Sequence, residues 1–273
     1  MTHSGADIAQ LLSAHGLRPS RALGQNFVAD ANTVRRIARL AGVGPGDRVL
    51  EIGAGLGSLT LALAETGASV VAVEMDRHLI PVLRSVTEPA GVDVVEGDAM
   101  RLDLTRLLSD HGGGQWSMVA NLPYNVATPL VLRTLVEVDA VTRLLVMVQR
   151  EVGERMAAAP GDSAYGSVSV RIAYFARATV VGRVPASVFV PRPRVESVLV
   201  RLERLPSPAV DPALVSYERL EIVVKAGFGK RRKMLRRSLA GVIEPEAFAR
   251  AGVRPDARAE ELDVAAWGRL AAS

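Results

Sequence analysis

The chain has 273 residues, of which 49% are hydrophobic and 23% are charged, and its formal net charge at pH 7 is +4. This length exceeds the usual single-domain size, and the composition is that of a folded globular protein rather than a disordered one. The chain contains no cysteine, which excludes disulfides, thiolate metal sites and thiol nucleophiles.

The first half of the chain predicts helices and strands in alternation. An amphipathic helix is expected around Ile8–Leu12, and Asp30 and Gly42 are the predicted N-cap and C-terminal stop of a helix over 30–41. The elements that follow are a strand over 49–52, a helix over 58–64, a strand over 70–74, a helix over 77–86 and a strand over 92–96. This alternation predicts a parallel, doubly wound sheet that binds its ligands at the strand carboxyl ends.

The second half continues this alternation and then becomes purely helical. Its expected elements are a strand over 117–121, a helix over 127–136, a strand over 143–149, helices over 150–157 and 168–174, and strands over 179–184 and 197–202. The segment 205–209 is a predicted linker, because it contains two prolines on either side of a serine. We therefore expect an α/β domain over 1–205, with a helical extension over 1–45, and a small all-helical domain over 210–273.

The segment Asn121-Leu122-Pro123-Tyr124 lies at the end of a predicted strand, where a ligand is expected. An exocyclic amine such as adenine N6 is a poor nucleophile unless acceptors hold its hydrogens and an aromatic face fixes the base. The Asn121 side chain and the Leu122 carbonyl can accept, Pro123 fixes the turn, and Tyr124 offers a face for stacking. The same four residues are equally consistent with a purely structural role, in which a strand ends in a proline-containing turn and the tyrosine packs against it.

A glycine-rich turn over 53–57 joins the strand over 49–52 to a helix, as in a nucleotide or nucleoside cradle. Alone, this turn fits NAD, S-adenosylmethionine or no ligand. Ser58 stands where a dinucleotide fingerprint has Gly or Ala, and Glu51 would place negative charge near a pyrophosphate. The cationic sulfonium and ammonium of S-adenosylmethionine tolerate Glu51 better.

Two further carboxylates end successive predicted strands. Glu74 is placed for the ribose hydroxyls of a nucleoside, and Asp98 for an adenine amine. Any one such carboxylate is more often a solvated loop residue or an N-cap. Three of them at successive strand ends favour a cofactor site.

Together these motifs resemble those of the KsgA/RsmA/Dim1 family of ribosomal RNA adenine dimethyltransferases. The matching segments are Leu23–Val28, Glu51–Gly57, Val73–Asp76, Gly97–Ala99, Asn121–Asn125, Val190–Ser197 and Phe228–Lys233. The erythromycin-resistance methylases, which act on large-subunit (23S) rRNA, share the amino-terminal motifs. The segment 149–166 and the basic segment after Phe228 resemble the small-subunit enzymes more closely.

The resemblance implies a Rossmann-like, S-adenosylmethionine-dependent methyltransferase domain with a small helical carboxyl-terminal domain. Its implied substrate is N6 of two adjacent adenosines near the 3′ end of small-subunit (16S) rRNA, within the 30S subunit or its precursor, with a role in subunit biogenesis. The implied cofactor-binding residues are Gln25, Asn26, Val28, Gly53, Gly55, Glu74, Met75, Asp98, Ala99 and Asn121. The family more often has Leu where this chain has Val28, whose expected contact is through its backbone.

The resemblance also implies the catalytic residues Asn121, Leu122 and Tyr124, with Phe189 as a second aromatic face opposite Tyr124. Phe189 also fits a core position before a Pro-rich turn. The expected reaction is in-line methyl transfer that needs no strong base, because the nucleophile is a neutral amine.

The densest positive charge follows Phe228, and a helix there is expected to turn Met234, Leu235 and Leu239 inward. A charge run is more often a solvated face, but its clustering beside methyltransferase motifs favours RNA phosphates. The expected RNA-binding residues are Lys230, Arg231, Arg232, Lys233, Arg236 and Arg237, with Arg192 and Arg194 as secondary candidates.

Other functional classes receive less support. The four histidines are far apart in the sequence, so no metal site is expected, and neither a bilayer-spanning segment nor a signal peptide is recognisable. We expect a cytoplasmic monomer. The alternatives are a methylase of 23S rRNA or of DNA adenine, a ribosome-assembly factor with little catalysis, and an NAD-dependent oxidoreductase, which Ser58 disfavours.

Overall fold

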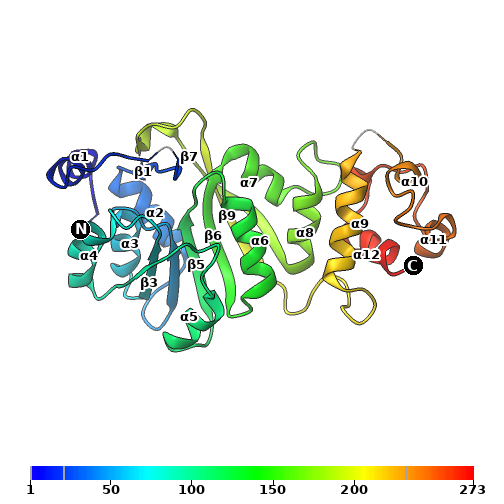
Figure 1. Cartoon of the computed structure of the whole chain (residues 1–273), viewed down its shortest axis with the longest axis horizontal. Helices are drawn as coiled ribbons and strands as arrows, with labels where there is room; N and C mark the ends of the chain where they lie inside the picture. Colours follow the sequence, from blue (N-terminus) through cyan, green and yellow to red (C-terminus); the bar gives the residue numbers. More distant parts are fainter. Residues whose placement is uncertain (1, 21, 231–232) are drawn as a thin grey trace. The chain divides into compact units, whose positions relative to one another are not determined.

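The computed structural model describes residues 2–20, 22–230 and 233–273, and the chain divides into two compact units (Figure 1). The first unit comprises the described residues up to Gly153 together with Thr179–Glu203. The second unit comprises Glu154–Ala178 and the described residues from Arg204 onward. This division differs from the boundary expected at 205–210, because the segment Glu154–Ala178 groups with the carboxyl-terminal helices.

The first unit is built on a seven-stranded sheet of order β4-β3-β2-β5-β6-β9-β7. The strands are β2 (Arg48–Ile52), β3 (Ser69–Glu74), β4 (Asp93–Glu96), β5 (Trp116–Asn121), β6 (Val141–Gln149), β7 (Ala176–Val184) and β9 (Ser197–Arg204). The first five strands in this order pair in parallel, as expected, but β9 pairs antiparallel with β6. The sheet is therefore mixed rather than wholly parallel. An apolar run indicates a strand but not its direction, so the sequence could not show this.

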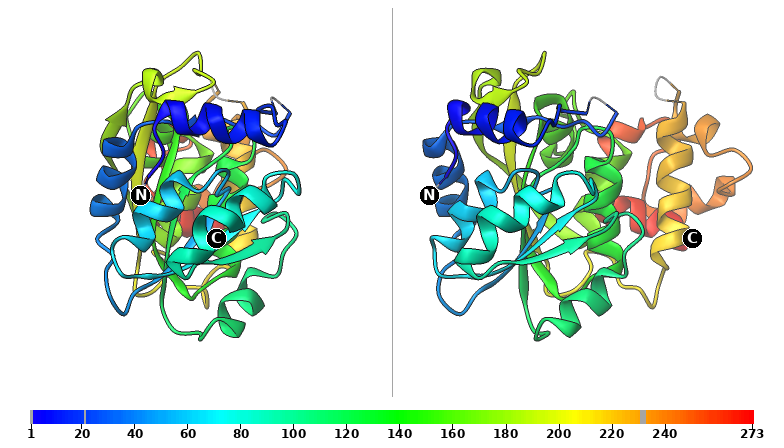
Figure 2. Two further views of the ribbon diagram at one scale, coloured as in Figure 1. Left: turned by 90° about the vertical axis from the view of Figure 1, so that its left-hand side faces the viewer. Right: turned by 60° about the vertical axis from the view of Figure 1, so that its left-hand side comes forward.

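Four helices that lie between these strands or before them in the chain pack against the sheet (Figure 2). They are α2 (Ala31–Ala41), α3 (Ser58–Ala64), α4 (Ile80–Thr87) and α6 (Ala127–Glu137). The other helices of this part of the chain are α1 (Gly5–Ala14), which precedes the sheet, α5 (Leu104–Asp110), and α7 (Arg150–Ala157), which crosses the boundary between the two units. The caps expected for α2 are confirmed: Asp30 accepts a 2.7 Å hydrogen bond from the Thr33 backbone N–H, and Gly42 has φ +63°. Helix α5 was not expected, although its N-cap Asp103, which accepts from the Arg106 N–H at 2.9 Å, marked its start.

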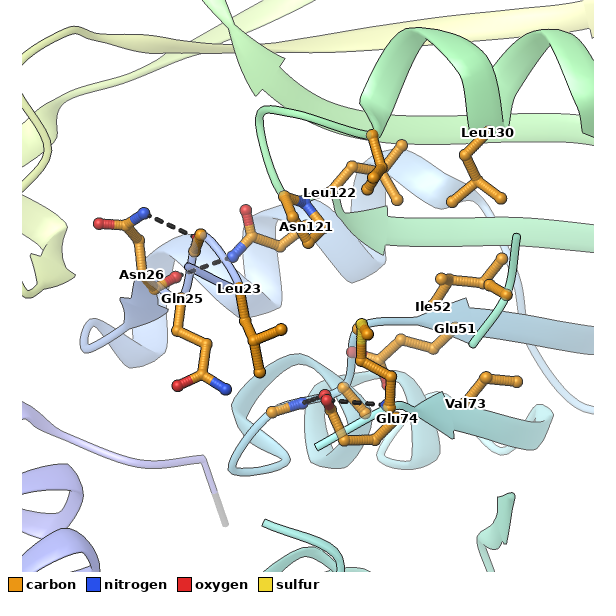
Figure 3. A pocket seen from close by; sticks show the side chains of 18 of the residues that line it. Leu23, Gln25, Asn26, Glu51, Ile52, Val73, Glu74, Asn121, Leu122 and Leu130 are labelled. Atoms are coloured by element: carbon orange, nitrogen blue, oxygen red, sulfur yellow. Dashed lines mark hydrogen bonds between the residues drawn. The ribbon is translucent and has the colours of Figure 1, made fainter. Parts of the chain in front are cut away.

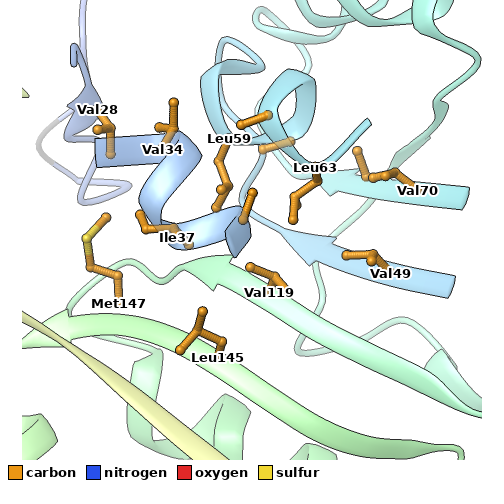
Figure 4. Packing of buried hydrophobic residues seen from close by; sticks show 14 of the residues in the cluster. Val28, Val34, Ile37, Val49, Leu59, Leu63, Val70, Val119, Leu145 and Met147 are labelled. Carbon is orange, nitrogen blue, oxygen red and sulfur yellow. The ribbon is translucent and has the colours of Figure 1, made fainter. Parts of the chain in front are cut away.

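A continuous apolar core holds α2 and α3 against the sheet (Figure 4). Its members include seven side chains that are each at most 4% exposed: Val34, Ile37, Val49, Leu59, Leu63, Val119 and Leu145. Each such buried side chain contributes about 1.5–3 kcal/mol relative to an exposed one. This packing fixes the carboxyl ends of β2, β3 and β5 relative to one another, which is where the candidate site lies.

The second unit contains helices and short connections, in accord with the purely helical periodicity of its sequence. Its helices are α8 (Ser167–Phe175), α9 (Tyr217–Gly229), α10 (Leu235–Ser238), α11 (Pro245–Ala251) and α12 (Val264–Ala272). Trp267 of α12 is fully buried against Gly227 of α9, where a Cβ would lie 2.3 Å from the indole ring. Among the described residues, no helix has the length and hydropathy needed to cross a bilayer.

Candidate functional site

A cavity of about 210 Å³ opens at the carboxyl ends of β2, β3 and β5 within the first unit (Figure 3). Its walls are the glycine turn after β2, the end of β3, the loop after β4, the loop after β5 and the segment before β1 (Phe27–Val28). The predicted site residues that line it are Gln25, Asn26, Val28, Gly53, Gly55, Glu74, Met75, Asp98, Ala99, Asn121, Leu122 and Tyr124. Segments almost 100 residues apart in the sequence therefore meet at one cavity.

The orientation of the Asn121 amide is fixed by a backbone carbonyl. Its Nδ2 donates a 3.0 Å hydrogen bond to the Asn26 carbonyl oxygen, and the Asn26 side chain in turn donates to the Gly24 carbonyl at 3.0 Å (Figure 3). Because a carbonyl can only accept, the nitrogen of Asn121 must face Asn26. The Asn121 Oδ1 is thereby left on the other side of the amide as an acceptor.

The loop after Asn121 is anchored to the neighbouring strand. The Leu122 N–H donates to the Met147 carbonyl of β6 at 3.1 Å, and the Leu122 side chain is 1% exposed. On the far side of the turn, the Pro123 carbonyl accepts from the Val126 and Ala127 N–H groups at the start of α6. The backbone of this loop is therefore held rigidly at both ends.

Glu74 joins the end of β3 to the glycine turn. Its Oε2 accepts from the Gly55 N–H at 2.8 Å, and its Oε1 accepts from the Met75 and Asp76 N–H groups at 2.9 Å. Burial raises the pKa of the Glu74 carboxyl, and these three hydrogen bonds oppose that rise. A carboxylate held by fixed backbone donors has its remaining lone pairs directed in advance toward a ligand with hydroxyl groups.

Glu51 is a buried acid with an unpartnered oxygen at the same cavity. Its side chain is 1% exposed, and burial, with a smaller effect of the Glu74 charge, raises its pKa to about 8. The nearby Thr60 hydroxyl opposes this rise in the pKa. Within the described part of the chain, Glu51 Oε2, Ser58 Oγ and Thr60 Oγ1 are buried without a hydrogen-bond partner. A buried acid in this state suits a cationic ligand, because an opposite charge offsets its desolvation.

Gln25 and Asp98 take part in local structure as well as lining the cavity. Gln25 Nε2 donates to Asp76 Oδ2 at 2.8 Å, and its Oε1 accepts from the Ser20 N–H at 2.7 Å. Asp98 Oδ1 accepts from the Met100 N–H at 2.9 Å. Asp76 was not singled out from the sequence, although its position two residues after Glu74 was a usable signal.

Gly55 is required both by its backbone conformation and by a close contact. Its φ is +60°, and an added Cβ would lie 3.0 Å from the Phe27 ring. We expect Gly55→Ala to cost about 1–3 kcal/mol of stability through backbone strain. We also expect it to weaken S-adenosylmethionine binding at least about tenfold, because the turn must shift. Calorimetry and thermal melts will measure both effects.

The matched control for that substitution is Gly91→Ala. Gly91 has φ +73° but open space where a Cβ would lie, so it carries similar strain without the contact. Equal losses of cofactor affinity in the two variants would show that strain alone is responsible.

Phe189 is not brought to the cavity. It is 3% exposed and belongs to the core that contains Val34 and Ile37. The short strand β8 (Phe189–Val190) pairs antiparallel with β1, so that Val28 is opposite Phe189. This pairing was not expected, and it directs the ring into the core, which was the alternative role considered for this residue.

The basic residues are exposed where the structure describes them, but the expected helix is not continuous. Helix α9 ends at Gly229 and α10 begins at Leu235, and Lys230, Lys233, Arg236 and Arg237 are exposed. Arg231 and Arg232 lie outside the described residues. Leu235 and Leu239 are buried as expected, whereas Met234 is 41% exposed because it is the extended N-cap of α10. Arg192 and Arg194 are exposed on the first unit, in the loop between β8 and β9.

Comparisons with known proteins agree with this arrangement. The family model described as "Ribosomal RNA adenine dimethylase" matches residues 17–273. The chain is 46% identical to "Ribosomal RNA small subunit methyltransferase A" of Acidothermus cellulolyticus, covering 97% of this chain and 92% of the relative. It is also 46% identical to the protein of the same name from Nocardia farcinica, covering 98% and 94%.

Two solved structures share the fold. The crystal structure of the 23S rRNA methyltransferase ErmE has a TM-score of 0.70 at 25% identity, covering 90% of this chain and 98% of that one. The crystal structure of a dimethyladenosine transferase from Plasmodium falciparum has a TM-score of 0.71 at 24% identity, covering 88% and 94%. The expected fold class, a Rossmann-like methyltransferase domain with a carboxyl-terminal helical region, is confirmed.

Proposed function

Because the chain belongs to the ribosomal RNA adenine dimethylase family, we propose that it dimethylates N6 of two adjacent adenosines near the 3′ end of small-subunit (16S) rRNA. It is an S-adenosylmethionine-dependent enzyme, as the family implies. The small-subunit substrate is supported by the names of its relatives. The proposed partner is the 30S subunit or its precursor, met by a cytoplasmic monomer that contributes to subunit biogenesis.

The fixed amide of Asn121 is the observation that carries this proposal. S-adenosylmethionine supplies an electrophilic methyl group when it is bound. Asn121 Oδ1 and the Leu122 carbonyl accept the two N6 hydrogens, which localises the lone pair of the amine toward the methyl group. The Tyr124 face stabilises the positive charge that develops on N6. Because these groups are preorganised, positioning and electrostatics account for catalysis without a strong base, and the proton leaves to water.

The residues of the cavity fit the cofactor. Glu74, held by three backbone N–H groups, is proposed to bind the ribose hydroxyls. Met75 and Ala99 are proposed to flank the adenine, and Asp98 to accept from its amine. The unpartnered Glu51 carboxyl gives the cavity an acid that a cationic ligand favours in its ionised form, which is the negative charge that a sulfonium and an ammonium require.

Methyl transfer to ribosomal subunits tests the function directly. Labelled S-adenosylmethionine is incubated with the protein and small subunits that lack the modification, with large subunits and DNA as parallel acceptors. We expect N6,N6-dimethyladenosine only in small-subunit RNA. Label in large-subunit RNA would instead support the erythromycin-resistance activity of the ErmE type, and cofactor binding without transfer to any acceptor would support an assembly factor.

The basic residues around α10 are proposed to contact RNA phosphates. We expect Arg236→Ala/Arg237→Ala to weaken binding to the small subunit and to reduce the slope of log affinity against log salt by about 1.5, because each lost phosphate contact removes about 0.7–0.9. Filter binding between low and moderate salt will measure this slope. The control is Arg106→Ala/Arg250→Ala, which removes two exposed arginines from α5 and α11. An unchanged slope in the first variant would remove these two residues from the RNA interface.

A further inference from the structure

The Tyr124 side chain is joined to a strand far away in the sequence. Its hydroxyl lies 3.3 Å from Ser197 Oγ, within hydrogen-bond distance. Ser197 is the first residue of β9 and is 1% exposed. The aromatic ring at the mouth of the loop is therefore linked to a buried position of the sheet rather than to its own loop.

Ser197 is itself firmly placed. It is opposite Gln149 in the antiparallel pairing of β6 with β9. The preceding residue, Glu196, accepts a 3.0 Å hydrogen bond from the Arg150 N–H through its carbonyl oxygen. The Asn121–Tyr124 loop is thus attached to the sheet at two points, through Leu122 to Met147 of β6 and through Tyr124 to Ser197 of β9.

A tyrosine ring turns about two side-chain torsions, and a bond at its hydroxyl fixes the first of them directly. The hydroxyl oxygen lies on the axis of the second torsion, so the bond restricts that rotation through the preference of a phenol hydrogen bond for the plane of the ring. Packing alone would not set the ring in this way, since Tyr124 is only partly buried. A face that must meet a planar base has a narrow range of useful angles. If the ring is already restricted before the base binds, less conformational entropy is lost on binding.

We propose that Ser197 is a positioning residue for methyl transfer, which holds the Tyr124 ring at the angle that meets the target adenine. This inference rests on the proposed function, because it uses Tyr124 as the face for the base. A neutral hydrogen bond contributes a net 0.5–1.5 kcal/mol, which corresponds to a roughly two- to twelvefold change in the population of the correct ring angle. Its loss should therefore appear in turnover rather than in cofactor affinity.

A double-mutant cycle tests this link. The variants are Ser197→Ala, Tyr124→Phe and the two combined, where Tyr124→Phe keeps the ring and removes only the hydroxyl. We expect each single variant to lower kcat about fivefold, with S-adenosylmethionine affinity and the KM for small subunits unchanged within about twofold. We expect the double variant to be no slower than either single variant, because both changes break the same bond.

Ser117→Ala is the matched control, since Ser117 is a buried serine, 4% exposed, on β5 of the same sheet. It reports the general cost of removing a buried hydroxyl, and it should retain wild-type kcat. If Ser197→Ala fails to fold, Tyr124→Phe still tests the bond without altering the strand.

Three results would overturn the inference: wild-type kcat in Tyr124→Phe, losses that multiply in the double variant, or an effect confined to KM. A failure of the proposed function is distinguishable, since the wild-type protein would then transfer no methyl group to small subunits before any variant is compared.

Discussion

Asn121→Ala is expected to lower kcat for methyl transfer by about 10²–10³-fold, the usual cost of removing one preorganised group that stabilises a transition state. Alanine has no acceptor for the N6 hydrogens, so the amine lone pair stays delocalised in the adenine ring. The same change removes the hydrogen bond to the Asn26 carbonyl, so a modest loss of cofactor affinity accompanies it. Single-turnover assays at saturating S-adenosylmethionine will separate the two effects.

Asn121→Asp tests the acceptor oxygen of residue 121 separately from the hydrogen bond that its side-chain nitrogen donates to the Asn26 carbonyl. An aspartate keeps an acceptor oxygen, but it cannot donate to the Asn26 carbonyl and would place two oxygens against each other. We expect an intermediate loss of about tenfold, corresponding to about 1.4 kcal/mol for the missing anchor. Asn32→Ala, on the exposed surface of α2, is the control for removing an asparagine. Near-normal turnover in Asn121→Ala would contradict the mechanism, and wild-type turnover in Asn121→Asp would show that the Asn26 contact is dispensable.

The sequence predicted those parts of the site that follow directly from strand ends. Glu74 and Asn121 are the last residues of their strands, and Glu51 is the last but one of its strand, within a run of parallel strands. Their meeting at one edge of the sheet therefore follows from the alternation of elements alone. The caps of α2 were predictable for the same reason, because capping depends on residues a few positions apart.

The features that were not predicted depend on pairings between distant segments. Phe189 fits an aromatic wall by its motif, but its ring is placed by the two-residue pairing of β8 with β1, about 160 positions away, and neither strand is long enough to show a period. The grouping of Glu154–Ala178 with the carboxyl-terminal helices also depends on contacts between distant segments. A single boundary in the sequence cannot describe this division, because the chain enters the second unit at Glu154, returns to the first at Thr179 and enters the second again at Arg204.

Glu51→Gln is expected to stabilise the cofactor-free protein by about 2–4 kcal/mol at pH 8. The folded-state pKa of Glu51 is raised from 4.5 to about 8, so between these values the folded state holds a proton that the unfolded state has lost. Stability therefore falls as the pH rises through this window and becomes constant above it. Glutamine carries no titrating proton, so the difference in unfolding free energy between variant and wild type should be small near pH 4.5 and largest at pH 8.

The same substitution should weaken cofactor binding. This result would distinguish an acid that binds the cofactor from a buried acid that only destabilises the fold. A cationic ligand favours the ionised form of Glu51, so binding to the wild-type protein releases a proton in this window. The affinity for S-adenosylmethionine should accordingly rise about tenfold between pH 6 and pH 8. Calorimetry of Glu51→Gln should show no such rise, whereas Glu96→Gln, at the exposed end of β4, should behave like the wild type.

Glu74 faces the same cavity, and burial raises the pKa of its carboxyl as well. A rise in affinity with pH that persists in Glu51→Gln would therefore assign the released proton to Glu74 instead. If Glu51→Gln is more stable than the wild type but binds the cofactor less well, then Glu51 destabilises the cofactor-free fold and its role is to bind the positively charged cofactor.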